Sequence, residues 1–125
     1  MAGMPDDRLP QVKLLPEDTK PVINDSGLCH KIHGFISGTI GAENIVVPKP
    51  VMGGEDFSMY GRTPEHVPIC MMWLGSTSPG LMKELKARGE KPASLHSPYL
   101  NPDYEKTIET GIKVMVGNVI GLTSK

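Results

Sequence analysis

The chain is short, at 125 residues, and nearly neutral, with a formal net charge of -1 and a pI of about 6.4. It fits one domain, and the absence of a basic stripe excludes nucleic acid and anionic lipid as electrostatic partners. No segment reaches the roughly 20 apolar residues that span a bilayer, so we expect a cytoplasmic protein without a membrane partner.

The first third of the chain predicts two short strands followed by a helix. QVKLL (residues 11–15) and PVI (residues 21–23) are strand candidates separated by the turn signal Pro16-Glu17-Asp18. Asn24-Asp25-Ser26 then offers N-cap side chains, and Gly41 a C-terminal stop. Between them, apolar residues recur at helical spacing: Leu28, Ile32, Phe35, Ile36 and Ile40.

The remaining elements alternate strands and a helix. NIVV (residues 44–47) predicts a strand that ends at Pro48, and ICMMWL (residues 69–74) predicts a central, buried strand. Asn101 or Asp103 is expected to cap a final helix. Its apolar face consists of Ile108, Ile112, Met115, Val116, Val119 and Ile120. Helices that alternate with buried strands predict the α/β class.

The cysteines and the histidines near them permit several interpretations. Cys29 and Cys70 form no C-x-x-C pair, which predicts reduced thiols but leaves a disulfide between them open. In CHKIH, His30 and His33 are three residues apart and could bind a metal together with Cys29. Because Leu28 and Ile32 mark the buried face, a solvated position for both histidines is the stronger interpretation.

Two further stretches could belong to a functional site. In VMGGEDFSMYG (residues 51–61), Gly53 and Gly54 predict a tight turn whose backbone N–H groups can approach a ligand. An ordinary acidic helix start at Glu55 and Asp56 is the alternative. His96 lies before Ser97-Pro98 at a predicted strand-to-helix junction, which restricts its conformation and makes it a candidate ligand, whereas His66 is a loop residue.

Together these stretches resemble a known family. PVMGGEDFSMYGRTPEHVPICMMWLGS, followed by SLHSPYLNPDYEKTIETGIKVM, resembles the C-terminal part of the M20-type metal-dependent amidohydrolases, which include hippurate, N-acyl-amino-acid and auxin-conjugate hydrolases. The resemblance implies part of a three-layer αβα zinc-peptidase-like domain. Residues 1–22 would end an inserted lid domain with its last strand, and residues 23–125 would form the C-terminal segment of the catalytic domain.

The resemblance also assigns roles to individual residues. His96, in the Leu-His-Ser-Pro turn, matches the family's C-terminal metal ligand, and Met52, Gly53 and Gly54 match the loop that lines the substrate pocket. Glu55 and Asp56 match an acidic pair that we interpret as structural. The implied cofactors are two divalent ions, zinc, manganese or cobalt, which lower the pKa of a bridging water and polarise the scissile carbonyl.

The family's other ligands and its glutamate base belong to motifs that this sequence lacks, so no catalytic residue is assigned. The predicted function is cleavage of the amide bond of N-acyl amino acids or small peptides, with this chain inactive alone and not retaining the metals. A noncatalytic α/β binding or assembly module is the alternative. An open strand edge at residues 69–74 further predicts a homo-oligomer.

Overall fold

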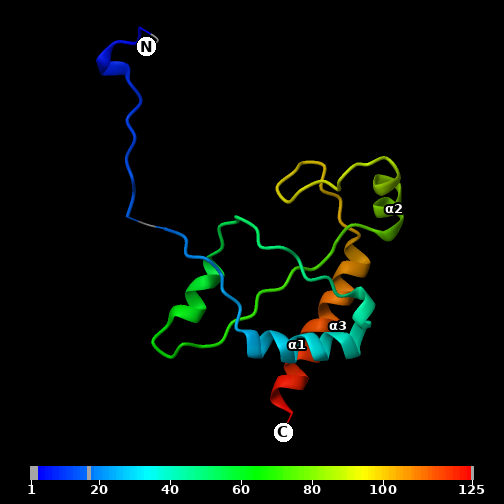
Figure 1. Cartoon of the computed structure of the whole chain (residues 1–125). Coiled ribbons are helices and arrows are strands. Elements are labelled where there is room, and N and C mark those ends of the chain that lie inside the picture. The colour runs from blue at the N-terminus through cyan, green and yellow to red at the C-terminus, as the bar shows by residue number, and fades with distance from the viewer. Residues whose placement is uncertain (1–2, 17, 125) are drawn as a thin grey trace.

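A computed structural model describes residues 3–16 and 18–124 of the chain. Helices account for 47% of the described part (Figure 1). The α-helices are α1 (Ser26–Ile40), α2 (Pro79–Ala87) and α3 (Tyr104–Thr123), and the short 3-10 helices are η1 (Asp6–Arg8), η2 (Ala42–Asn44) and η3 (Asp56–Arg62). None of these helices is both long enough and apolar enough to cross a membrane.

The predicted α/β class, and with it the three-layer αβα arrangement, is wrong, because the described residues contain no strand. The segments predicted as strands, residues 11–15, 21–23, 44–47 and 69–74, share no ladder of backbone hydrogen bonds. A strand is stable only when a neighbour satisfies its N–H and C=O groups. The β-branched and apolar residues of these segments are typical of strands, but they do not determine whether a segment finds a partner strand.

The segment predicted as a buried central strand is instead attached to the start of α1. The Asp25 N–H donates to the Ile69 carbonyl (2.8 Å). The Asn24 side chain binds both backbone groups of Met71, donating to the carbonyl at 2.9 Å and accepting from the N–H at 2.8 Å. Ile69 is buried, whereas Trp73 is exposed. A side-chain amide therefore takes the place of a strand neighbour at this position.

Helix α1 forms as its caps predict. The Asp25 carboxylate accepts a hydrogen bond from the Leu28 N–H (2.7 Å). At the other end Gly41 adopts φ 87°, which a glycine tolerates without a Cβ clash, and its N–H donates to Ser37. Ile32 is buried. The local signals of cap, period and glycine stop are sufficient for this helix.

Helices α1 and α3 pack against each other through glycines. A Cβ added at Gly121 would lie 2.7 Å from the Phe35 ring, and one added at Gly117 would lie 2.9 Å from Thr39 Oγ1. These glycines let the two helix backbones approach closely. Val114 and Asn118 are the buried residues of α3 on this side. The inward face of α3 thus combines glycines with the apolar Val114 and the polar Asn118.

The residues predicted to form the apolar face of α3 are largely exposed. These residues are 51–59% exposed, and they are Ile108, Ile112, Met115, Val116, Val119 and Ile120. Four of them, residues 108, 112, 115 and 119, are separated alternately by four and three positions, and the exposed Leu122 continues this spacing. That is the seam spacing of a coiled coil, with the β-branched Ile112 and Val119 at equivalent positions.

Copies of the chain are expected to associate through this outer face of α3, because the seam can pair with a second copy of itself. Light scattering after size exclusion at micromolar concentration should show a dimer or larger species. The double variant Ile112→Glu/Val119→Glu should be monomeric. Lys106→Glu makes the same change in net charge outside the seam and should leave the association intact. A monomeric parent chain would contradict this expectation.

Residues 3–16 extend away from the three α-helices (Figure 1). Val12 and Leu14 are 91% and 93% exposed, and residues 11–15 form no strand. The proposed division into residues 1–22 as the end of a lid domain and residues 23–125 as catalytic segment stays a prediction. Met1, Ala2 and Glu17 of the first part lie outside the described residues.

Candidate functional site

His96 lies in a tight turn just before α3. The Ser97 N–H donates to the Ser94 carbonyl (3.1 Å), which places Leu95 and His96 at the two central positions of the turn. A second turn follows, in which the Leu100 N–H donates to the Ser97 carbonyl (3.1 Å). Local hydrogen bonds therefore fix the backbone on both sides of Pro98, and the histidine side chain is exposed.

The backbone of His96 has φ 67°, in the left-handed region that favours glycine. A non-glycine residue in this conformation costs of the order of 1–2 kcal/mol. Histidine is nevertheless among the residues that adopt it most often, and His66 does so as well, with φ 48°. The turn therefore fixes the backbone at His96, and its side chain is exposed to solvent.

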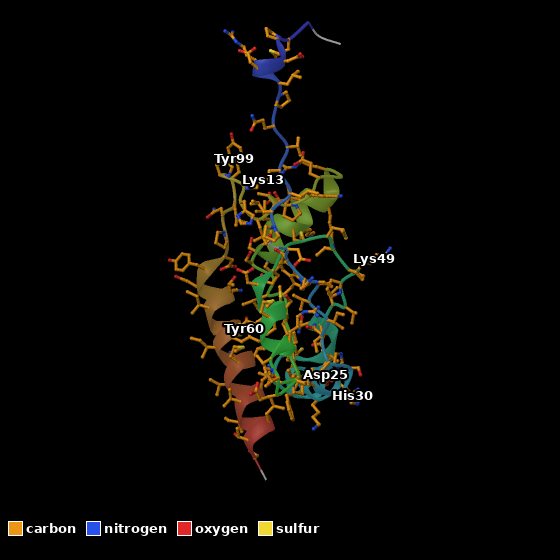
Figure 2. All side chains as sticks on the ribbon, turned by 90° about the vertical axis from the view of Figure 1, so that its left-hand side faces the viewer. Lys13, Asp25, His30, Lys49, Tyr60 and Tyr99 are labelled. Atoms are coloured by element: carbon orange, nitrogen blue, oxygen red, sulfur yellow. The ribbon has the colours of Figure 1, made fainter. Side chains whose placement is uncertain are left out.

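The loop is tied to the rest of the molecule at its C-terminal end. The Asp103 N–H donates to the Ser76 carbonyl (2.8 Å), which joins the start of α3 to the segment after residues 69–74. Tyr99, on the same loop, is exposed and projects from the surface (Figure 2). The turn with His96 is therefore an exposed loop attached to the start of a 20-residue helix.

The segment with Met52, Gly53 and Gly54 is open rather than tightly turned. Residues 51–55 form no turn, and neither glycine has a positive φ. Met52 is fully exposed, and a Cβ at Gly53 would meet nothing within 4 Å. The predicted tight turn is wrong, because this backbone is in an ordinary conformation. Its main chain is nevertheless accessible to a ligand.

The acidic pair after the glycines begins a short helix, as predicted. The Glu55 carboxylate accepts a hydrogen bond from the Phe57 N–H (3.2 Å), and Asp56 is the first residue of η3. This contact is an N-cap, which satisfies an otherwise free donor. The structural interpretation of Glu55 is therefore supported by a specific contact.

The described residues do not bring the candidate ligands together into a metal centre. No group of three or more histidine, cysteine, aspartate or glutamate side chains within residues 3–16 and 18–124 is arranged to hold a metal ion. His30 and His33 are exposed on α1. The alternative metal site at Cys29, His30 and His33 is thus not formed.

Sequence reasoning missed a hollow of about 430 Å³ between the start of α1 and η3. Its lining includes Asn24, Arg62, His66 and Ser58, but none of the predicted site residues. Ser58 is 2% exposed, and its Oγ has no hydrogen-bond partner in the described part of the chain. Nothing in the sequence distinguishes this serine from the polar residues around it.

Comparison with known proteins gives one match. The model of peptidase family M20/M25/M40 matches residues 10–119, which include His96 and the segment with Met52, Gly53 and Gly54. No curated protein and no solved structure matches the chain.

Proposed function

Because the chain belongs to peptidase family M20/M25/M40, we propose that it is the C-terminal segment of a hydrolase that cleaves the amide bond of N-acyl amino acids of the hippurate type. Peptidases of this family are generally metal-dependent. Membership supports a hydrolase by resemblance, and N-acyl amino acids are the substrates that we propose for it. We also propose a cytoplasmic location, which agrees with the free thiols of both cysteines.

The observation that carries the proposal is the turn at His96. The backbone there adopts a conformation with an energetic cost, two consecutive turns stabilise it, and the imidazole is exposed. A neutral imidazole offers one ring nitrogen lone pair, a usual ligand for zinc and related ions. We assign His96 the role of a metal ligand in the complete hydrolase.

One imidazole does not make a metal centre. A catalytic zinc generally has three protein ligands and a water, and the described residues do not form such a group. The residues present thus do not fit a complete two-metal site, with zinc, manganese or cobalt. We therefore propose that the chain alone neither retains the metals nor turns over substrate.

The accessible segment at Met52, Gly53 and Gly54 is assigned to substrate contact. The Met52 side chain is exposed and apolar, and a thioether adapts its shape to an apolar acyl group. Without a Cβ at Gly53 and Gly54, a planar amide or a carboxylate can approach the backbone N–H groups closely. These features support a substrate with an apolar acyl group and a polar amino-acid end.

The proposal is tested in two arms. The purified chain with zinc, manganese or cobalt should release no glycine from N-benzoylglycine, and turnover would contradict its inactivity alone. In the second arm, residues 10–119 replace the segment aligned with the same family model in an active M20 amidohydrolase. This hybrid enzyme should hydrolyse N-benzoylglycine. A folded hybrid without activity would contradict the proposed hydrolase role.

A noncatalytic binding or assembly module remains the second candidate. The lack of a three-ligand group among residues 3–16 and 18–124 favours it. Both candidates expect the isolated chain to be inactive, so the hybrid enzyme separates them. A noncatalytic module would leave the hybrid folded but inactive.

A further inference from the structure

Two thiols from distant parts of the chain face each other across the junction of α1 and residues 69–74. Cys29 Sγ and Cys70 Sγ are 3.2 Å apart, although 41 positions separate them in the sequence. Both cysteines are free and half-buried. Cys29 lies in the first turn of α1, and Cys70 follows the buried Ile69. A covalent S–S bond is about 2.0 Å long, so the sulfurs need to move only about 1.2 Å closer.

Hydrogen bonds on both sides of Cys70 hold the pair in place. The Ile69 carbonyl accepts from the Asp25 N–H, and both backbone groups of Met71 bind the Asn24 side chain. The Cys29 N–H in turn donates to the Asp25 carbonyl (2.9 Å). Residues 24–25 thus connect both cysteine backbones and hold them close together.

We propose that Cys29 and Cys70 form a reversible disulfide that staples α1 to residues 69–74 under peroxide oxidation. Nothing in the proposed hydrolase role uses either thiol, so the site is separate from His96 and from the segment at Met52. The oxidant is hydrogen peroxide, and the reductant that restores the thiols is a small dithiol.

The reaction begins at Cys29. Burial first, and the neighbouring Cys29 thiol second, raise the pKa of Cys70 to about 12, so Cys70 enters the reaction as a thiol. Cys29 loses its proton as its sulfur attacks one peroxide oxygen, the O–O bond breaks, and the hydroxide released takes up that proton to become water. Cys29 is left as a sulfenic acid.

The Cys70 sulfur then attacks the Cys29 sulfur. The S–O bond breaks, and the hydroxyl group leaves with the Cys70 proton as a second water. In total the two thiols lose two electrons and two protons, and one peroxide is reduced to two waters. A dithiol reverses the step by two thiol–disulfide exchanges and is itself oxidised.

A disulfide between residues 41 positions apart should stabilise the folded chain, mainly by restricting its unfolded state. We expect the midpoint of thermal unfolding to rise by roughly 10 °C on oxidation and to return on reduction. In the reduced chain, the hydrogen bonds of residues 24 and 25 hold residues 69–74 against α1. The disulfide would add a covalent link and make their separation rarer.

The test is oxidation of the full chain by one equivalent of hydrogen peroxide, followed by intact mass and non-reducing peptide mapping. The expected product is a single chain with no covalent link to a second copy, and its mass is lower by two hydrogens. Peptide mapping should find one peptide pair joined through Cys29 and Cys70. Formation should be at least about tenfold slower in urea, where the folded proximity is lost.

Cys29→Ser and Cys70→Ser should each abolish the mapped peptide pair. Because the main readout uses the parent chain, a variant that fails to fold does not affect the result. A covalent dimer, a sulfinic acid at either cysteine in place of the pair, or a rate unchanged by urea would overturn the proposal.

Discussion

Replacing His96 by asparagine in the hybrid enzyme is expected to lower kcat/KM for N-benzoylglycine at least about 100-fold. Even residues that only support metal ligands commonly cost 10–100-fold when changed, so loss of a ligand should cost no less. Asparagine accepts the left-handed backbone found at His96, with φ 67°. The change therefore removes the imidazole and leaves the turn in place, and steady-state hydrolysis measures the effect.

The matched control is His66→Asn. His66 is also exposed and also has a positive φ, at 48°. Its replacement makes the same chemical change in the same backbone region, and kcat/KM should stay within about twofold of the parent hybrid. Equal losses in the two variants would show that the histidines act through the fold, and an active His96→Asn hybrid would contradict the ligand role.

A second large effect is expected at the contact between α1 and α3. Gly121→Val should lower the free energy of unfolding of the isolated chain by about 3 kcal/mol. Even an added Cβ would lie 2.7–2.8 Å from three atoms of the Phe35 ring, so either the ring or the two helices must shift. Urea unfolding followed by far-UV circular dichroism gives the change.

Gly38→Val is the control for this variant. Gly38 is an exposed residue of α1, and a Cβ there would meet nothing within 4 Å. Valine is a slightly better helix former than glycine, so stability should be unchanged or raised by a few tenths of a kcal/mol. If both valine variants lose the same stability, the close approach of the two helices at Gly121 is wrong.

The features that could be predicted from the sequence are those fixed by near neighbours in the chain. The cap at Asp25, the stop at Gly41 and the N-cap of η3 at Glu55 each depend on contacts within four residues. Helix α2 was missed although Ser78 caps it and Pro79 occupies its first position, a recognised start signal. At nine residues its apolar period was too brief to be decisive.

Features set by distant partners could not be predicted in the same way. A run such as residues 69–74 has the composition of a buried strand, but only a pairing partner makes it one, and the Asn24 amide takes that position instead. The period of α3 correctly groups its apolar residues on one face. It does not say which face is covered, and the glycines at 117 and 121 were the signal for the α1 side.

In the candidate site, too, some features could be predicted from the sequence and others could not. The Leu-His-Ser-Pro stretch predicted a restricted turn, and the hydrogen bond from Ser97 to Ser94 confirms one. The positive φ of His96 could not be read from the sequence, since histidine adopts both signs. At Gly53 and Gly54 the two glycines permit a tight turn, but the chain does not form one there.

The metal content of the hybrid enzyme tests the role of His96 most directly. After dialysis against zinc-free buffer, elemental analysis should find two zinc ions per chain in the parent hybrid and in His66→Asn, and fewer in His96→Asn. An undiminished zinc content in His96→Asn would contradict the assignment of this imidazole as a metal ligand.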